Sequence, residues 1–365
     1  MKAACIAGDP GGARCLSPVI AELIQRGVDV QLIAYRQGLA ILQEHGLPVV
    51  VCDEMLASKA AAYLNELGVD LLLCSTSMNG QDFEKTFIQA AAQFGIVSIS
   101  ILDFWSNYRG RFTTQPPAGG LDALPDWIAV MDTRAVEEMV ADGFPETRLV
   151  ITGQPAFDEL FLPRDVAAIR QRVRAELGCS EGDLLLIFAS QPFSEVTAES
   201  GISPVGYDEM ECLDLLIESL KGISMRPKIW VRPHPRETIE KFTRFSYEPL
   251  IVSSEFDRIS AILAADGVVG MSSNFLLEAA LLGLAVLSIQ PRQTGPGPLP
   301  LVSLNLGQVV TDTSALTEAV TFWIPDCRRP HSSQVPATTS PFRAGAASRV
   351  ADLVLNRLPS PKPTL

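Results

Sequence analysis

Small polar residues at a helix start mark the first candidate site, within the stretch Gly270–Gly283. Ser272, Ser273 and Asn274 precede an apolar helix, so their hydroxyl groups and free backbone N–H groups meet the positive end of the helix dipole. That arrangement suits a phosphate or pyrophosphate group. Glu278 follows Asn274 by one helical turn on the same face, where its carboxylate could accept hydrogen bonds from a ribose diol. A capped core helix whose carboxylate faces solvent is the alternative.

A basic loop held by prolines is the second candidate. The stretch Trp230–Glu237 reads WVRPHPRE, with a proline on each side of His234. The prolines restrict the backbone around the imidazole, and Arg232 and Arg236 add local positive charge to an acidic chain. Such a loop suits a phosphate or a phosphate leaving group. A surface histidine in a proline turn is the alternative, and the flanking arginines favour the functional interpretation.

Polar residues also follow two apolar runs that are typical of buried strands. Ser190 and Gln191 come directly after Leu184–Ala189, and from a strand end they could reach a phosphate or the edge of a base. Asp103 comes directly after Val97–Leu102, which makes its carboxylate a candidate general base. A plain loop is the alternative for Ser190 and Gln191.

Two aromatic residues lie close to Asp103 in the sequence. Trp105 and Tyr108 could stack on a sugar ring, or they could bury themselves as part of an aromatic loop. Because Asp, Asn, Tyr and Arg crowd together after a buried run, the functional interpretation is favoured.

The loop after the first apolar run is rich in glycine. Gly8–Gly12 reads GDPGG, and Gly11 and Gly12 would let a ligand approach the backbone, with Arg14 nearby as a positive group. The segment fits neither the GxGxxG dinucleotide fingerprint nor a P-loop. A tight turn between a strand and a helix explains the glycines equally well.

Composition limits the class of protein. The 365 residues are 47% hydrophobic and 19% charged, which is typical of a well-packed globular chain of about two domains. A net charge of −13 argues against a nucleic-acid partner, although it allows a small anionic ligand. The seven cysteines form no CxxC pair and the three histidines form no cluster, so we expect reduced thiols in a cytoplasmic protein and no metal site. No signal peptide and no membrane span are expected.

The elements that must position these residues follow a regular order, in which short apolar runs alternate with amphipathic helices. This alternation predicts two doubly wound, Rossmann-like α/β domains facing a cleft, with ligands beyond the carboxyl ends of the strands. We place the domains at residues 1–161 and 162–365. The second is expected to end in a helix over Phe342–Leu358, after an irregular segment from Pro325 to Pro341. The predicted strands are Lys2–Ala7, Val28–Ala34, Pro48–Cys52, Asp70–Cys74, Val97–Leu102, Trp127–Met131 and Leu149–Thr152, then Leu184–Ala189, Lys228–Arg232, Leu250–Val252, Gly267–Gly270, Ala285–Ile289 and Val309–Val310.

In this order the motifs resemble the GT-B glycosyltransferase superfamily. The likeness is to the branch with non-hydrolysing UDP-N-acetylglucosamine 2-epimerases and capsule or teichoic-acid type transferases. The loop Arg232–Glu237 is similar to that superfamily's His-Pro loop, and Ser272–Glu278 is similar to its serine-rich helix start with a later glutamate. Gly8–Gly12 resembles its early glycine loop, and Val150–Asp158 (VITGQPAFD) resembles its VTGNxxxD-like segment. The resemblance implies that the C-terminal domain binds the nucleotide of a donor and the N-terminal domain lies on the acceptor side.

The chain also departs from the epimerase pattern. Epimerases of this branch carry a His-x-Glu-Ala-Gly-type strand end where this chain reads Ile101–Trp105 (ILDFW). They carry a Pro-Glu-Glu-x-x-Arg segment where this chain reads Ala123–Trp127 (ALPDW). Asp103 is then the one remnant of the acidic set expected for epimerisation, and this favours glycosyl transfer.

The resemblance therefore implies a metal-independent glycosyltransferase that uses a nucleotide-diphosphate sugar, first of all a UDP-sugar, and no other cofactor. A hydroxyl-bearing acceptor would be the second substrate, in the biosynthesis of surface polysaccharide or a glycoconjugate, and a homodimer is compatible with the sequence. A sugar-nucleotide epimerase or hydrolase is one alternative, and a non-catalytic GT-B-like binding protein is another. Asp103 and His234 would be catalytic. The binding residues would be Gly11, Gly12, Arg14, Ser190, Gln191, Arg232, Ser272, Ser273, Asn274 and Glu278.

Overall fold

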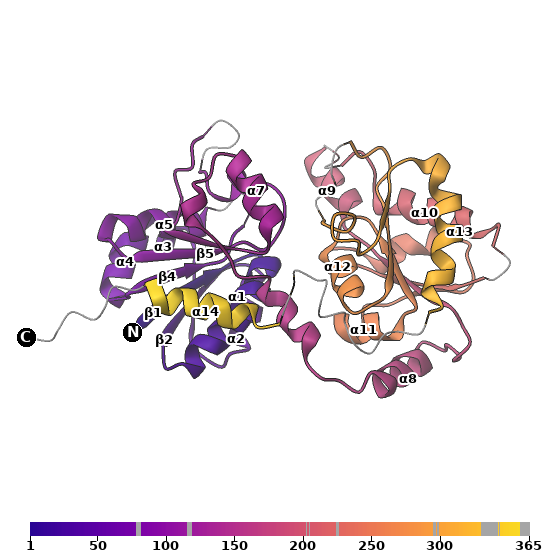
Figure 1. Ribbon diagram of the computed structural model, residues 1–365, viewed down its shortest axis with the longest axis horizontal. Helices are drawn as coiled ribbons and strands as arrows, with labels where there is room; N and C mark the ends of the chain where they lie inside the picture. Colours follow the sequence, from indigo (N-terminus) through magenta and orange to yellow (C-terminus); the bar gives the residue numbers. More distant parts are fainter. Residues whose placement is uncertain are drawn as a thin grey trace, which may run out of the picture. The chain divides into compact units, whose positions relative to one another are not determined.

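The computed structural model describes residues 1–77, 82–114, 119–201, 203, 205–223, 226–294, 297, 299–329, 342 and 344–357. These residues form two compact units, and the chain passes from the first to the second between Phe161 and Leu162 (Figure 1). The C-terminal helix, α14 (Ala346–Arg357), belongs to the first unit. Both units are parallel sheets flanked by helices, which confirms the predicted doubly wound α/β class.

The first unit is built on a seven-stranded parallel sheet with the order β3-β2-β1-β4-β5-β6-β7. The order reverses where β1 pairs with both β2 and β4. The strands are β1 (Lys2–Ala7), β2 (Asp29–Ala34), β3 (Val49–Val51), β4 (Leu71–Cys74), β5 (Val97–Ile101), β6 (Trp127–Val130) and β7 (Leu149–Ile151). The helices are α1 (Pro10–Gln25), α2 (Gly38–Gln43), α3 (Glu54–Ser58), α4 (Ala60–Leu67), α5 (Phe83–Phe94), α6 (Tyr108–Arg111), α7 (Thr133–Ala141), η1 (Glu146–Arg148) and η2 (Pro155–Phe161).

The central strand β1 shows why the sheet is covered on both faces. Its sequence KAACIA is apolar after Lys2, so side chains on both faces of the strand must be buried. Ala3, Cys5 and Ala7 belong to a core that α1 and α14 share. Ala4 and Ile6 belong to the opposite core, which α3, α4 and α5 cover. The near-continuous apolar strand is therefore explained by two helical layers.

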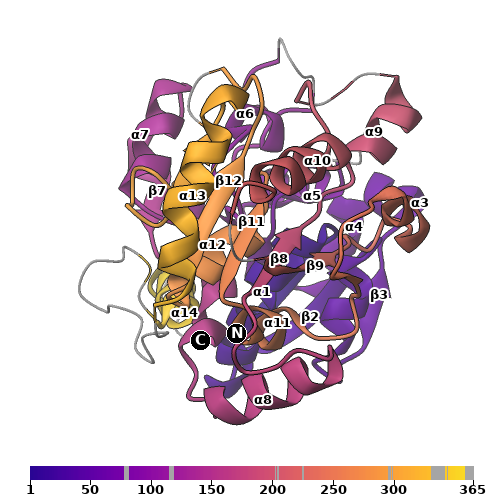
Figure 2. The same ribbon diagram turned by 90° about the vertical axis from the view of Figure 1, so that its right-hand side faces the viewer.

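The second unit is built on a six-stranded parallel sheet with the order β10-β9-β8-β11-β12-β13. Helices α10 and α13 share its core on one face, with α13 alongside β12 (Figure 2). The strands are β8 (Leu185–Ala189), β9 (Lys228–Arg232), β10 (Leu250–Val252), β11 (Gly267–Gly270), β12 (Ala285–Ile289) and β13 (Gln308–Val310). The helices are α8 (Val166–Glu176), α9 (Phe193–Ser200), α10 (Glu209–Leu220), η3 (Ile239–Arg244), α11 (Arg258–Ala264), α12 (Asn274–Leu281), η4 (Thr313–Ala315) and α13 (Leu316–Cys327).

The C-terminal helix corrects one expectation from the sequence, which assigned it to the second domain. Phe342 is buried in edge-to-face contact with Trp105 and Phe157 of the first unit. Asp158 then caps α14, since its carboxylate accepts hydrogen bonds from the N–H groups of Ala346 (2.9 Å) and Ala347 (2.8 Å). These contacts bury the apolar face of α14 beside α1, where both helices lie close together in Figure 1.

The segment expected to be irregular from Pro325 to Pro341 begins within a helix. Helix α13 continues through Pro325 to Cys327, and Trp323, Ile324 and Cys327 are buried. The apolar face of this helix fills the core beside β12, and burial outweighs the poor helix propensity of proline. Residues 330–341 lie outside the described residues.

Candidate functional site

The reversal of strand order in the second unit lies between β8 and β11, the usual ligand position in a doubly wound sheet. Ser190 and Gln191 leave the carboxyl end of β8, between the loops that follow β9 and β11. The Ser190 N–H donates to the carbonyl of Arg232 (3.1 Å). The Gln191 Oε1 accepts the N–H of Ser272 (2.7 Å). The structure therefore brings together three of the strand ends singled out from the sequence.

The start of α12 has the expected capping geometry. Ser273 is the N-cap residue, and its Oγ accepts the N–H of Phe275 (3.2 Å). Asn274 follows at the first helical position. Its fully buried Oδ1 has no hydrogen-bond partner among the residues that the structure describes. With the Ser272 N–H bonded to Gln191, the polar groups at this helix start are partly satisfied by the protein itself.

Glu278 lies one turn further along α12, and its surroundings contradict the alternative in which its carboxylate faces solvent. The residue is only 6% exposed, so the carboxylate does not face solvent. Both of its oxygens accept hydrogen bonds from Nε of Arg258, at 3.1 and 3.0 Å. Arg258 is the first residue of α11. A buried carboxylate needs such a partner because burial penalises an unpaired charge.

The loop after β9 holds Arg232 and His234 in different surroundings. The Arg232 guanidinium donates to the carbonyl of Phe256 (2.7 Å) and lies 5.7 Å from the ring centroid of Phe275, so packing holds it. His234 is exposed, and its Nδ1 accepts the N–H of Arg236 (3.2 Å). This contact leaves a proton on Nε2 in the neutral imidazole.

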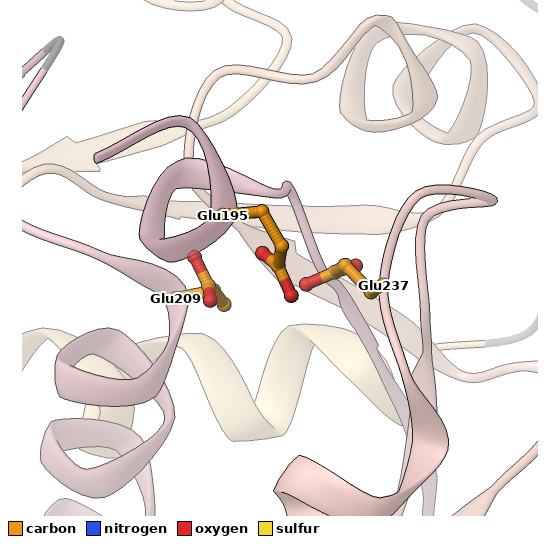
Figure 3. A group of neighbouring side chains, drawn as sticks. All are labelled: Glu195, Glu209 and Glu237. Atoms are coloured by element: carbon orange, nitrogen blue, oxygen red, sulfur yellow. The ribbon is translucent and has the colours of Figure 1, made fainter. Parts of the chain in front are cut away.

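Three carboxylates converge beneath this loop, from Glu195 of α9, Glu209 of α10 and Glu237, which follows His234 (Figure 3). Lys241 of η3 joins them, with Nζ at 2.9 Å from Glu195, 2.6 Å from Glu209 and 2.7 Å from Glu237. We refer to these four residues as the Lys241 cluster. The side chains of Glu209 and Glu237 are fully buried, and that of Lys241 is 15% exposed.

Burial and bonding act in opposite directions in the Lys241 cluster. Burial raises the pKa of Glu237 above its ordinary value, although Lys241 and the His234 N–H oppose the shift. Burial acts in the same direction on Glu209, but hydrogen bonds from Lys241 and Ser194 leave its pKa lowered. Burial would lower the pKa of Lys241, whereas its bonds to Glu209, Glu237 and Glu195 raise it. The ammonium thus stays charged among the three carboxylates.

Asp103 lies at the end of β5 in the first unit, and the hydrogen-bond partners of its carboxylate contact one oxygen, Oδ1. Oδ1 accepts hydrogen bonds from Thr76 (2.9 Å) and from Arg111, with which Asp103 forms a largely buried ion pair. The backbone carbonyl of Asp103 accepts the amide of Gln154 (2.9 Å). Within the described part of the chain, Oδ2 has no hydrogen-bond partner. It faces Gly11, where a Cβ would come within 2.6 Å of it.

The glycine loop is therefore required by close packing. Gly12 lies against Ser75, where a Cβ would come within 2.6 Å of the serine Cβ. Gly11 and Gly12 are in the first turn of α1, and the structure brings them to Asp103 and to the end of β4. Arg14 of the same helix is exposed.

A second acidic residue of the first unit was not anticipated. Glu84 of α5 is 3% exposed and accepts hydrogen bonds from Tyr35, Ser75 (3.1 Å) and Ser77 (3.1 Å). Burial raises the pKa of Glu84 from 4.5 to about 7, against the lowering effect of the hydrogen bonds from Tyr35 and Ser77, and the nearby charge of Asp9 adds to the rise. Glu84 is thus a buried acid that can change protonation near neutral pH.

The aromatic residues near Asp103 are structural. Trp105 is 2% exposed, and its Nε1 donates to Asp132 (2.9 Å). Tyr108 is also buried, and its hydroxyl donates to Glu138 (2.5 Å). The suggestion that they stack on a sugar ring is wrong for this structure, because both rings are packed into the core and both polar atoms have protein partners.

Several residues near the strand ends of the two units were missed in the sequence, chiefly Glu84 and Arg111 in the first unit and Glu195, Glu209, Lys241 and Arg258 in the second. One signal was available, since Glu237 and Lys241 are only four residues apart, although Glu237 precedes η3 and shares no helical turn with Lys241. The other contacts, such as those of Arg111 with Asp103 and of Arg258 with Glu278, join residues of different elements, so no helical or strand spacing could have indicated them.

The comparisons with known proteins bear on the fold. No family model matches the chain, and no curated protein matches its sequence. The solved structure of UDP-GlcNAc 2-epimerase from Neisseria meningitidis, bound to UDP-GlcNAc, is similar to it with a TM-score of 0.71 and 13% identity. That match covers 98% of this chain and 100% of the other. The glycotransferase of kitacinnamycin is similar with a TM-score of 0.64 and 17% identity, covering 98% and 99%.

MurG from Acinetobacter baumannii has a TM-score of 0.58 at 14% identity, over 97% of this chain and 99% of that one. These likenesses confirm the GT-B fold that the motifs suggested, near that of UDP-GlcNAc 2-epimerases. In the described part of the chain, no helix has the length and apolar character needed to cross a bilayer.

Proposed function

We propose that this chain is an enzyme acting on a UDP-sugar, and more specifically a metal-independent glycosyltransferase. The observation that carries the proposal is the meeting of three loops at the strand-order reversal of the second unit, after β8, β9 and β11. They bring Ser190 and Gln191 next to the His234 loop and to Ser272–Asn274. Structures with a similar fold include an epimerase bound to UDP-GlcNAc and another in complex with UDP-GlcNAc and UDP.

The roles follow from the chemistry of each group. The N–H groups and hydroxyls at the start of α12, with His234, would hold the diphosphate, and the helix dipole would stabilise the charge that develops on the leaving phosphate. Because Arg232 is held by Phe256 and Phe275, its positive charge would act from a fixed position. Glu278 would accept hydrogen bonds from the ribose, and Arg258 would hold its carboxylate in place.

Asp103 would take the proton of an acceptor hydroxyl. The ion pair with Arg111 and the hydrogen bond from Thr76 hold the carboxylate through Oδ1, and Oδ2 has no hydrogen-bond partner among the described residues. Gly11 and Gly12 carry no side chain, so no Cβ covers the end of the sheet next to this oxygen. Arg14 would add positive charge at the same end of the first sheet.

The test is a binding titration with UDP followed by a product assay with UDP-sugars. We expect UDP to bind the wild-type protein and to raise its unfolding temperature. His234→Ala and Ser272→Pro should each weaken UDP binding, the second because proline removes the N–H through which Ser272 binds Gln191 and so disturbs the meeting of the loops after β8 and β11. Absence of UDP binding, or unchanged binding in both variants, would contradict the proposal.

A sugar-nucleotide epimerase is the second candidate, favoured by the structural similarity to UDP-GlcNAc 2-epimerases. Incubation with UDP-GlcNAc without an acceptor separates the two candidates. An epimer or a free sugar as product would support the epimerase or a hydrolase. Product that forms only when a hydroxyl acceptor is added would support glycosyl transfer.

A further inference from the structure

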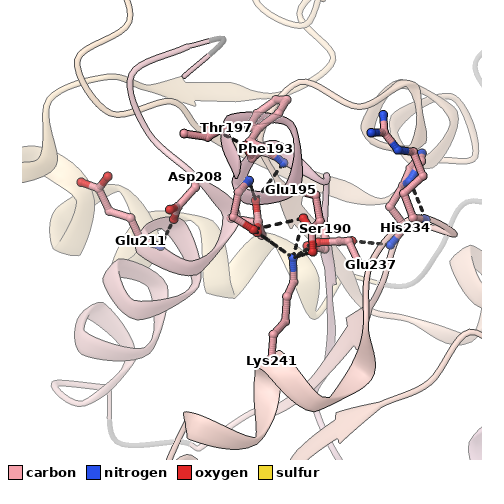
Figure 4. Close-up of polar contacts among 12 residues, drawn as sticks. Ser190, Phe193, Glu195, Thr197, Asp208, Glu211, His234, Glu237 and Lys241 are labelled. Atoms are coloured by element: carbon pink, nitrogen blue, oxygen red, sulfur yellow. Dashed lines mark hydrogen bonds and ion pairs between the residues drawn. The ribbon is translucent and has the colours of Figure 1, made fainter. Parts of the chain in front are cut away.

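The loop that carries His234 is bound to the end of β8 through one side chain, that of Glu237. Its Oε1 accepts the hydroxyl of Ser190 (2.7 Å), and its Oε2 accepts the backbone N–H of His234 (Figure 4). One carboxylate thus fixes two of the residues assigned to the candidate site, and the position of the His234 backbone depends on where Glu237 is held.

Lys241 holds Glu237, and it holds Glu209 in the same way. The Glu209 carboxylate caps the start of α9, accepting the N–H groups of Phe193 (3.0 Å) and Ser194 (3.1 Å). Glu195 of the same helix bonds the other side of the Lys241 ammonium. One side chain therefore connects the loops after β8 and β9 with the starts of α9 and α10.

Charge explains why this connection must be a cation. The Lys241 cluster holds three carboxylates within 4.8 Å of one another, two of them fully buried. Without the ammonium, these charges would repel one another in a poorly solvated place, and the segments that carry them would separate.

We propose that Lys241 is a positioning residue for the candidate nucleotide site, which fixes the His234 loop against Ser190 by holding Glu237, Glu209 and Glu195 around one ammonium. The expected effect on binding rests on the proposed function, because a displaced His234 should weaken diphosphate binding. The structural part of the inference is independent of that function, and the two parts can be tested separately.

The structural part is tested by hydrogen exchange. Protein labelled with ¹⁵N only at histidine gives three backbone amide signals, because the chain has three histidines, and His234→Gln identifies the relevant one. In the wild type, the His234 amide should be protected because it donates to Glu237. Lys241→Met should increase its exchange rate by about tenfold or more, as expected when a local hydrogen bond is lost.

A double variant separates positioning from stability. The wild-type cluster has one cation and three carboxylates, and the double variant Lys241→Met with Glu209→Gln has two carboxylates and no cation, so both have the same net charge. The double variant should therefore fold even if Lys241→Met alone unfolds. We expect near wild-type stability but a still unprotected His234 amide. Lys241→Arg should restore part of the protection, because it keeps the charge. Lys221→Met, at an exposed pair with Glu218, is the matched control and should change nothing.

The functional part is tested by UDP binding to the same variants. We expect the affinity of the double variant to fall by about tenfold, the value of one lost hydrogen bond to a charged group. An unchanged His234 amide in the double variant would overturn the positioning role. Absence of UDP binding to the wild type would instead contradict the proposed function. The exchange rate of the His234 amide would still test the positioning role of Lys241 in that case.

Discussion

The carboxyl ends of the two sheets hold their charged residues in different ways. In the first unit, Asp103 and Glu84 are acids turned inward, one paired with Arg111 and the other bonded to Tyr35 and two serines. In the second unit, the buried charges lie beneath the loops, and His234 above them is exposed. The buried acids of the first unit thus lie at the sheet edge itself, whereas buried charge in the second unit supports a loop that presents an accessible group.

The largest expected effect comes from breaking the buried pair of the first unit. Arg111→Ala leaves Asp103 buried without its cation, and we expect the free energy of unfolding to fall by about 3–5 kcal/mol. Urea unfolding measures this loss. Arg134→Ala removes a more exposed pair with Glu138 on α7 and should cost less than about 1 kcal/mol. Equal losses in the two variants would mean that the buried ion pair contributes no more to stability than the more exposed one.

The next effect depends on pH and on Glu84. Its pKa is raised from 4.5 to about 7 in the folded protein, so the folded state binds the proton more tightly than the unfolded state in that window. The free energy of unfolding should therefore fall as pH rises through the window, by about 3 kcal/mol from this group.

Glu84→Gln isolates that contribution, since Gln cannot ionise and keeps an oxygen to accept from Tyr35. Urea unfolding of both proteins at pH 5 and pH 8 gives the change in the free energy of unfolding between these pH values for each protein. The contributions of other titrating groups cancel when the two changes are subtracted. We expect the wild type to lose stability relative to Glu84→Gln on going to pH 8. Parallel pH dependence of the two proteins would mean that Glu84 has an ordinary pKa.

A smaller effect is expected at Arg258 in the second unit. Arg258→Ala leaves Glu278 buried and without its guanidinium, and we expect a loss of about 2 kcal/mol in the free energy of unfolding together with weaker UDP binding. Arg172→Ala, at an exposed pair with Glu176 on α8, is the control. A loss of stability with unchanged UDP affinity would assign Glu278 to the fold rather than to the ribose.

The smallest effect on stability is expected at His234. The side chain is exposed, so His234→Ala should change the free energy of unfolding by less than about 0.5 kcal/mol. UDP binding should nevertheless weaken by about tenfold, if His234 donates a charged hydrogen bond to the diphosphate. Calorimetric titration and urea unfolding of the same preparation check both values. A stability loss as large as that of Arg111→Ala would make His234 a structural residue.

Most of the strands could be predicted from the sequence, because a buried parallel strand is a continuous apolar run that ends at a polar residue. Leu184–Ala189 and Gly267–Gly270 are such runs, and the strands β8 and β11 lie at these positions. The positions of Ser190, Gln191 and Ser272 at strand ends followed from the alternation of strands and helices, whereas the pairing of β8 with β11 is known only from the sheet order.

The partners of these residues could not be predicted in the same way. Arg258 and Glu278 meet because α11 and α12 bring side chains 20 positions apart together, and no local pattern encodes that approach. Asp103 looked like an accessible acid, yet Arg111 folds back onto it through the short helix α6. The aromatic residues after β5 looked available for a ligand, but Phe342 arrives from the far end of the chain to pack on Trp105.

The sequence by itself determined the doubly wound architecture, the strand ends and the polar residues that stand there. Hydrophobic periodicity is a local property, and it is visible in any stretch of the chain. The tertiary structure alone decided which charges are neutralised, by which partner, and which unit receives the C-terminal helix. Those outcomes depend on desolvation and on contacts between distant segments, and both exist only after the chain has folded.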